Sequence, residues 1–274
     1  MKKLSLLLVG VLTAVLFLVG CGNDTKKESA AKTDAKGPIT IGVTAGPHAE
    51  VMDFVKQEAA KQGVELKVVE FSDFVQPNVA LDNKELDMNS FQHQPYLDNM
   101  VKDRGMKLVT IGKSILLPMG LYSSQVKDLK DLPEGASIAI PNDPTNGGRA
   151  LLLLQQAGIV KLKEGLGVKA TVADIIANPK NVKIQELDAA QIPHSIKDVT
   201  LAAVNTNYAL QAKLNPLKDA LVIENKDSLY ANVIVVREAD KDNARYKKVV
   251  EIYHSPAVKK FVEEHFKGTI VPAF

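Results

Sequence analysis

The residues best suited to chemistry lie between Ala136 and Gly158, where the chain reads ASIAIPNDPTNGGRALLLLQQAG. The pattern predicts a buried strand over 137–140, a turn-rich loop over 141–148 and a helix from Arg149 to Gly158. Free N–H groups at a helix N-terminus favour an anion, and an Arg in the first turn adds a bidentate partner for a carboxylate or phosphate. Two glycines before it would let a ligand come close. The stretch is therefore either an anion site or an ordinary strand–helix corner, because glycine-rich corners are common.

A second candidate is the aromatic segment FQHQPY at 91–96, which we place in a loop between a strand and a helix. Open α/β sheets bind ligands at such strand ends. Phe74 occupies the equivalent loop after the preceding strand. Together with Phe91, His93 and Tyr96 it would give an apolar, polarizable wall for a small ligand. The alternative is that these rings simply pack beneath the helices.

Two asparagines follow or interrupt predicted strands. Asn205 comes directly after the strand 199–204, where it either caps the next helix or faces a ligand. Asn232 lies inside the apolar strand 230–236, and a buried amide there needs partners that a ligand could supply.

Several classes of site find no support in the sequence. The five histidines and the single cysteine show no metal-binding spacing. There is no G-x-S-x-G, Walker A or dinucleotide fingerprint. We therefore expect no catalytic residues, no metal and no cofactor, although a catalytic role for His93 in an exported hydrolase stays an alternative.

The composition further limits the class of protein. The chain has 274 residues, 46% of them apolar and 24% charged, which is typical of a globular protein. Lys2 and Lys3 account for the whole formal net charge of +2, so the remaining chain is neutral. A neutral body argues against nucleic-acid binding, which needs a concentrated positive face.

The N-terminus carries an export pattern. Lys2 and Lys3 precede an apolar run over 4–19 that is too short to span a bilayer comfortably, which predicts a signal peptide over 1–20. The sequence LVGC that ends at Cys21 resembles the bacterial lipobox, which implies lipidation of this only cysteine. Residues 22–37 are polar and lack an apolar period, so we expect 21–37 to be a lipidated, flexible tether.

From Pro38 onward strands alternate with helices, which predicts an α/β architecture with largely parallel sheets. The expected strands are 39–43, 64–71, 85–89, 107–111, 115–122, 137–140, 182–187, 199–204, 221–223 and 230–236. The expected helices begin near Pro47, Pro77, Pro95, Arg149, Thr171, Asn243 and Pro256.

The same alternation divides into two blocks. If the chain crosses between lobes at 117–122 and again at 229–233, the first lobe comprises 38–118 and 231–274 and the second comprises 119–230. The ligand cleft then lies between two lobes joined by two crossing segments.

Taken in order, the lipobox, FQHQPYL at 91–97, PNDPTN at 141–146 with RALLLLQ at 149–155, and YAN at 230–232 resemble the NlpA lipoprotein family of methionine-binding proteins. The likeness covers about residues 37–274. It implies a type II periplasmic-binding-protein-like fold and a substrate-binding lipoprotein of an ABC importer. The implied partners are L-methionine, an ABC permease and its ATPase, and the implied location is the extracytoplasmic face of the cell membrane, with a monomeric, lipid-anchored chain.

The resemblance also assigns ligand-binding residues. It places the carboxylate-binding arginine at Arg149, the two ligand-binding asparagines at Asn205 and Asn232, and the side-chain pocket at Phe74, Phe91, His93 and Tyr96. Methionine offers a carboxylate, an ammonium and a thioether that suit these three groups. Position 74 is often Tyr in the family and is Phe here, which removes a hydroxyl. A methionine-containing dipeptide, another small apolar amino acid, and a surface adhesion lipoprotein without transport remain alternatives.

Overall fold

The computed structural model describes residues 37–225 and 229–274. The predicted signal peptide, Cys21 and the tether up to residue 36 lie outside the described residues. Within the described ranges, none of the helices has the length and hydropathy required to cross a bilayer.

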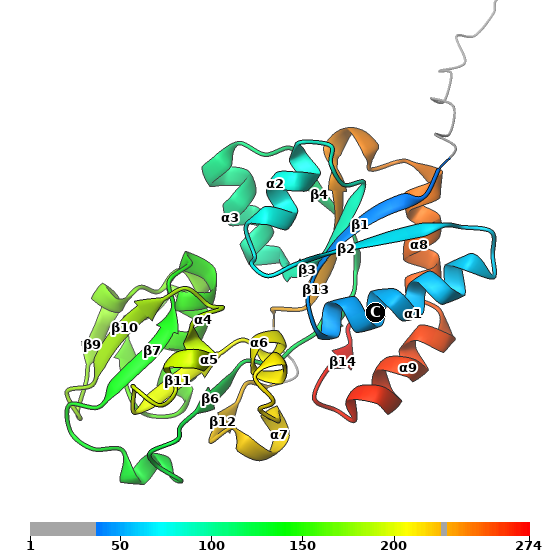
Figure 1. Ribbon diagram of the computed structural model, residues 1–274. Coiled ribbons are helices and arrows are strands. Elements are labelled where there is room, and N and C mark those ends of the chain that lie inside the picture. The colour runs from blue at the N-terminus through cyan, green and yellow to red at the C-terminus, as the bar shows by residue number, and fades with distance from the viewer. Residues whose placement is uncertain (1–36, 226–228) are drawn as a thin grey trace, which may run out of the picture. The chain divides into compact units, whose positions relative to one another are not determined.

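The first lobe is built on a five-stranded sheet with the order β2-β1-β3-β13-β4 (Figure 1). The strands are β1 (Ile39–Thr44), β2 (Leu66–Phe71), β3 (Met88–His93), β4 (Leu108–Lys113) and β13 (Asn232–Arg237). Only β13 runs antiparallel to its neighbours, so the sheet is largely parallel, as expected. The C-terminal strand thus inserts between β3 and β4, which are separated from it by more than 100 residues.

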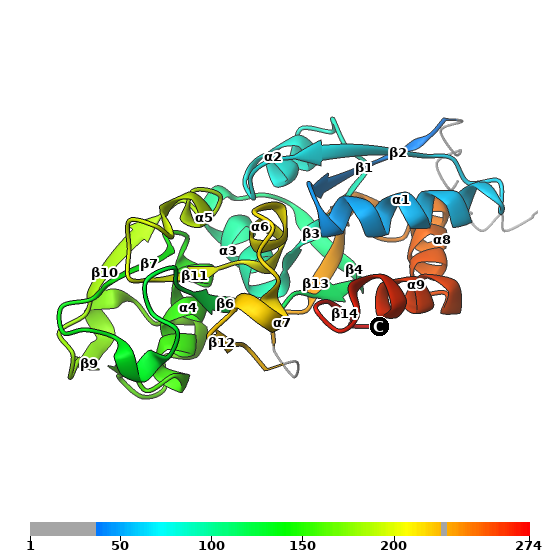
Figure 2. The ribbon, with the colours of Figure 1, turned by 60° about the horizontal axis from the view of Figure 1, so that its bottom comes forward.

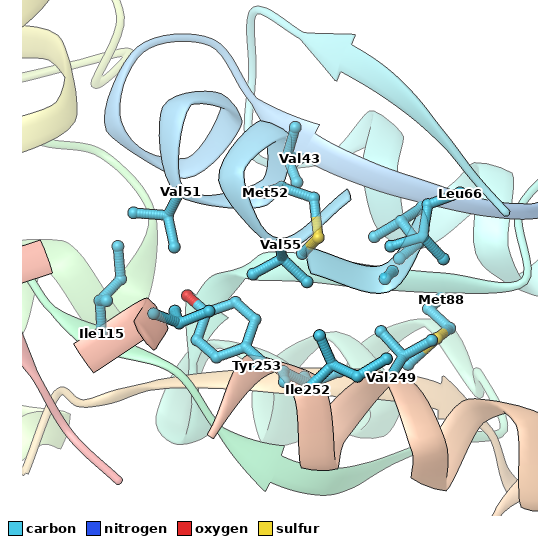
Figure 3. Close-up of a cluster of buried hydrophobic side chains, with 14 of the residues drawn as sticks. Val43, Val51, Met52, Val55, Leu66, Met88, Ile115, Val249, Ile252 and Tyr253 are labelled. Atoms are coloured by element: carbon cyan, nitrogen blue, oxygen red, sulfur yellow. The ribbon is translucent and has the colours of Figure 1, made fainter. Parts of the chain in front are cut away.

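Helices cover both faces of this sheet. They are α1 (Pro47–Ala60), α2 (Gln76–Asp82), α3 (Gln94–Arg104), α8 (Ala244–Tyr253) and α9 (Pro256–Phe266). Both ribbon views place α8 and α9 beside α1 (Figures 1 and 2). Side chains of α1 such as Val55 point toward Ile252 and Tyr253 of α8, and all three are buried (Figure 3). Burial of an apolar side chain of this size contributes about 1.5–3 kcal/mol to folding, so this contact fixes the C-terminal helices on the first lobe.

The second lobe has a sheet of the same size with the order β10-β7-β11-β6-β12. The strands are β6 (Gly120–Tyr122), β7 (Ser137–Pro141), β10 (Lys183–Leu187), β11 (Leu201–Val204) and β12 (Val222–Ile223). Its helices are α4 (Pro144–Gln156), α5 (Ile192–Ser195), α6 (Thr206–Gln211) and α7 (Pro216–Asp219). Only β6 is antiparallel to its neighbours. The expectation of a two-lobed α/β protein is confirmed.

The chain passes between the two sheets twice, once between β4 and β6 and once between β12 and β13. A short pair formed by β5 (Ile115–Leu116) and β14 (Val271–Pro272) ties the C-terminal end to the first of these crossings. A second short pair, β8 (Lys161–Leu162) with β9 (Ile175–Ala177), extends the second lobe.

Two predicted segments differ from the structure near the candidate residues. The residues 90–93, expected in a loop, complete the fully buried strand β3. Polar residues led to the loop assignment, but here the amides satisfy one another: Gln92 exchanges hydrogen bonds with Asn78 and donates to Asn89 Oδ1. Helix α4 begins at Pro144, not at Arg149, because Asp143 is its N-cap and accepts from the Asn146 N–H.

Two further expectations were wrong in detail. The helix predicted over 171–177 is a single 3-10 turn over Val172–Asp174 followed by β9. Asp174 accepts from the N–H and hydroxyl of Thr171, which is a helix-start pattern, but the β-branched Ile175 and Ile176 continue into a strand. The single extended run predicted over 115–122 is split between β5 and β6 by the segment 117–119, which contains Pro118.

Candidate ligand-binding site

One buried cavity brings together all seven residues singled out as ligand-binding. It contains about 360 Å³ of space not occupied by atoms, a volume that includes space open to solvent. The predicted residues in its lining are Phe74, Phe91, His93, Tyr96, Arg149, Asn205 and Asn232. Six others complete it: His48, Gln92, Leu117, Asn146, Thr206 and Asn207.

The aromatic wall is set by the strand end of β3 and the first turn of α3. Phe91 and His93 lie two residues apart on β3, and both line the cavity. His93 is also the N-cap of α3, and its Nδ1 accepts from the Tyr96 N–H at 3.1 Å. The ring centroids of Phe74, Phe91 and Tyr96 lie 6.1–6.3 Å apart, and the Tyr96 hydroxyl donates to the Phe74 carbonyl.

His93 is held neutral. Burial and the nearby Arg149 guanidinium lower its pKa from 6.5 to about 3. Its Nδ1 is used by Tyr96, and its Nε2 lies 3.2 Å from Asn146 Oδ1. A general base needs a free lone pair within reach of the substrate, and both ring nitrogens are occupied. The geometry therefore lends no support to a hydrolase that uses His93.

Asn232 reaches the cavity through strand register. It lies opposite His93 in the β3–β13 pairing, at the first residue of β13. Its Nδ2 donates to the Phe91 carbonyl at 2.9 Å and to His48 Nε2 at 2.8 Å. His48 in turn donates from Nδ1 to Thr44 Oγ1, and burial lowers the His48 pKa to about 3. Since both protons of its amide nitrogen are used, Asn232 offers the cavity its oxygen.

Asn205 stands at the N-cap of α6 but makes no capping hydrogen bond. Its Nδ2 instead donates to Asn146 Oδ1 at 2.9 Å. Among the described residues, its Oδ1 is buried without a hydrogen-bond partner, and so is the Nδ2 of Asn207. The cavity wall therefore carries one unpaired acceptor and one unpaired donor. Buried polar groups of this kind are costly unless something else binds them.

Arg149 lies in the second turn of α4 and is almost fully buried. Its Nε and Nη2 donate to the two carboxylate oxygens of Glu224 at 3.0 and 2.5 Å, and Nη2 also donates to the Leu117 carbonyl. The Tyr230 ring covers one face, 4.3 Å from the guanidinium carbon. Within the described part of the chain Nη1 makes no hydrogen bond. One edge of the guanidinium is thus taken by Glu224, and Nη1 is what remains for a ligand.

The glycines before Arg149 serve packing. A Cβ on Gly147 would lie 2.8 Å from the Pro141 carbonyl oxygen, and one on Gly148 would lie 2.4 Å from that of Val168. Both contacts are with backbone, which cannot move aside easily. The expectation that these glycines admit a ligand is therefore corrected: they let α4 pack against the end of β7 and the 3-10 turn over Gly167–Lys169.

Contacts across the cavity join the two lobes. Tyr208 of α6 donates to the Ser72 carbonyl, and its ring lies 4.9 Å from Phe74. His93 and Asn146 meet from opposite lobes. Bound ligand would thus be enclosed by both sheets.

Sequence reasoning missed seven residues of this region, namely the six other lining residues and Glu224, the partner of Arg149. Asn146 lies three residues before Arg149, and Asn207 lies two residues after Asn205, so both belong to segments that the sequence analysis had already singled out. His48 sits in the first turn after Pro47 and was considered only for metal binding; within the described residues no group of three His, Cys, Asp or Glu is placed to hold a metal ion. Nothing in the sequence marks Glu224, 75 residues from Arg149.

The two sheets, the two crossings and the enclosed cavity define a two-lobed α/β binding protein. The model of the family described as NlpA lipoprotein matches residues 39–274, so this chain belongs to the NlpA lipoprotein family. The D-methionine-binding lipoprotein MetQ of Salmonella typhimurium is 45% identical over 267 residues, which cover 96% of this chain and 95% of the relative.

Solved structures agree with this placement. A nutrient binding protein from Burkholderia cenocepacia bound to methionine matches with a TM-score of 0.84 and 54% identity, over 86% of this chain and 100% of that one. An ABC transporter periplasmic substrate-binding protein from Coxiella burnetii matches with a TM-score of 0.82 and 47% identity over the same shares.

Proposed function

We propose that this chain is the substrate-binding lipoprotein of an ABC importer and binds methionine in the cavity between its lobes. The observation that carries the proposal is the chemistry of the wall: an aromatic cluster beside a guanidinium, an unpaired amide oxygen and an unpaired amide nitrogen. An amino acid with a soft apolar side chain complements all four. The methionine named in the relative and bound in the solved structure supports the same ligand.

Each part of methionine has a partner in this proposal. The carboxylate accepts from Arg149 Nη1 and Asn207 Nδ2. The ammonium donates to the amide oxygens of Asn205 and Asn232. The thioether lies against the rings of Phe74, Phe91, His93 and Tyr96, where each sulfur–ring contact is worth about 0.3–1.5 kcal/mol. The lobe boundaries 38–118, 119–230 and 231–274 and hinge closure around the ligand belong to the same proposal.

Attachment and delivery complete the proposed function. A lipid on Cys21 holds the chain at the extracytoplasmic face of the cell membrane, and residues 22–37 act as a tether. The closed, loaded form is what the permease recognises, and its ATPase drives uptake. The names of the family and of the relatives as lipoproteins support the anchor.

Calorimetry on the purified chain tests the ligand. L-methionine, D-methionine and a methionine-containing dipeptide are titrated in turn, and we expect saturable heat with methionine. Arg149→Lys should weaken binding by about 10-fold or more, because an ammonium cannot keep the planar fork on Glu224 and also reach the ligand. Arg104→Lys, at the exposed end of α3, is the matched control and should bind as the parent does. Absence of heat with all three ligands would refute the proposal, and heat with the dipeptide alone would change the ligand.

A further inference from the structure

We infer that Asp143, a residue outside the cavity lining, fixes the hydrogen-bond polarity of the cavity wall and thereby makes the site select ligands with a protonated amine. Asp143 acts through Asn146 and Asn205, so it is a positioning residue. The inference rests on the proposed function for the identity of the ligand, but the polarity itself is a property of the protein and is testable without any ligand.

The chain of hydrogen bonds starts from a group that can only accept. The Oδ1 of Asp143 accepts from the Asn146 N–H and from the Thr145 hydroxyl, both at 2.9 Å. Its Oδ2 accepts from Asn146 Nδ2, also at 2.9 Å. Because a carboxylate has no proton to donate, the Asn146 amide must turn its nitrogen to Asp143 and its oxygen to the opposite side.

The orientation of Asn146 then determines its two other partners. Its Oδ1 accepts from Asn205 Nδ2 at 2.9 Å, so the amide of Asn205 must turn its nitrogen toward Asn146 and leaves its oxygen for another partner. The same oxygen lies 3.2 Å from His93 Nε2, which must therefore carry the imidazole proton.

The far end of the network gives an independent check. His93 Nδ1 faces the backbone N–H of Tyr96 at 3.1 Å, and a backbone N–H can only donate. Nδ1 must therefore be the unprotonated nitrogen of the neutral ring, which again puts the proton on Nε2. The carboxylate at one end and the backbone N–H at the other demand the same direction, so the network has one consistent polarity.

In the cavity, the direction of this network leaves Oδ1 of Asn205 buried and, among the described residues, without a hydrogen-bond partner. An ammonium group satisfies it by donating. A ligand with a carbonyl at that position presents a second acceptor and leaves both oxygens unpaired, which a site of this kind rejects strongly. The wall therefore discriminates by hydrogen-bond direction.

Asp143→Asn separates this role from helix capping. Asn caps helices about as well as Asp, so its oxygen keeps the Asn146 N–H. Its Nδ2 then falls where Oδ2 was, facing Asn146 Nδ2. Two donors meet, and the Asn146 amide can relieve this only by turning over, which opposes Asn205 and His93 in turn. Asp128→Asn is the matched control, because Asp128 caps the 3-10 turn over Leu129–Asp131 in the same way, on the surface.

The test measures affinity for L-methionine and for 4-methylthio-2-oxobutanoate, which has a carbonyl in place of the amine. We expect the parent and Asp128→Asn to prefer methionine by about 100-fold or more. Asp143→Asn should reduce that ratio by about 10-fold or more, mainly through weaker methionine binding. A ratio within twofold of the parent would overturn the inference. If Asp143→Asn does not fold, Asn146→Ala cuts the same network, keeps the cap and should reduce the ratio likewise.

Nitrogen-15 spectra of the His93 imidazole give the second readout. The ligand-free parent should show the Nε2–H form, because the Tyr96 N–H donates to Nδ1. A parent ring protonated on Nδ1 would overturn the polarity argument. Failure of the parent to bind methionine while the ring is in the Nε2–H form would refute the proposed function and leave the polarity standing.

Discussion

Two buried histidines should make this protein sensitive to mild acid. His48 and His93 both line the cavity, and burial lowers the pKa of each from 6.5 to about 3, with Arg149 also contributing at His93. In the unfolded chain each ring returns to its ordinary pKa. Between pH 6.5 and 3 the unfolded state therefore binds protons that the folded state does not, and stability falls as the pH falls through this range.

The size of the effect follows from the two pKa values. Above pH 6.5 neither state is protonated and the histidines cost nothing. At pH 5 the unfolded form gains about 2 kcal/mol per histidine, or about 4 kcal/mol for the pair. That is a large share of the roughly 5–15 kcal/mol that holds a typical domain folded. The folded protein does not have to expose either ring for this loss to occur, because the loss depends only on the difference in proton binding between the folded and the unfolded state.

Urea unfolding at pH 7.5 and pH 5 measures this loss, followed by circular dichroism in buffers of equal ionic strength. The comparison is with His48→Gln, His93→Asn and the double variant, because every other titrating group cancels in the difference. Asn at 93 retains an N-cap oxygen for Tyr96. Each single variant should lose about 2 kcal/mol less than the parent between the two pH values, and the double variant about 4 kcal/mol less. Equal losses in all four proteins would show that these rings are protonated in the folded state and refute the reasoning.

Two other expectations concern packing and attachment. Gly148→Ala should lower the unfolding free energy by about 1–3 kcal/mol in a urea titration, because the new Cβ would lie 2.4 Å from the Val168 carbonyl oxygen. The cost of this clash exceeds the roughly 1 kcal/mol that Ala gains over Gly in a helix. An unchanged midpoint would mean that α4 shifts freely away from this turn. Cys21→Ser should move the protein from the detergent phase to the aqueous phase of a partition experiment; retention in the detergent phase would exclude the lipid as the anchor.

Much of the fold was predictable because its signals are local. The strand β1 has an apolar side chain at every second position, and α1 and α3 are each bounded by a Pro at the start and a Gly beyond the end. The predicted strand stopped at Asn89 because the polar residues that follow it, such as Gln92, look exposed in sequence. The partners of the Gln92 amide lie up to 14 residues away, so its satisfaction is a tertiary property. A local sequence pattern does not reveal such hydrogen-bond partners.

The site divides in the same way. Arg149, Asn205 and Asn232 were found through motifs and the resemblance to a family, and all three line the cavity. The contact between Arg149 and Glu224 joins helix α4 to the segment after β12, and only the topology of the second sheet brings them together. The start of α4 was misplaced because Asp143 was taken as a loop residue, and this hid both its capping role and its link to Asn146.

The charges of the site explain why these missed residues matter. Among the residues that the structure describes, Arg149 is the only side chain in the lining that carries a full charge at neutral pH, because both histidines are neutral there, and Glu224 balances it. A lining whose single charge is balanced by a neighbouring carboxylate suits a zwitterion, which carries no net charge. Selection then depends on hydrogen-bond direction: Arg149 Nη1 donates, Asn205 Oδ1 accepts, and Asn146 links the Asn205 amide to the carboxylate of Asp143. Methionine binding that changes little with salt is the behaviour this arrangement requires, since screening acts on net charge far more than on buried, paired groups.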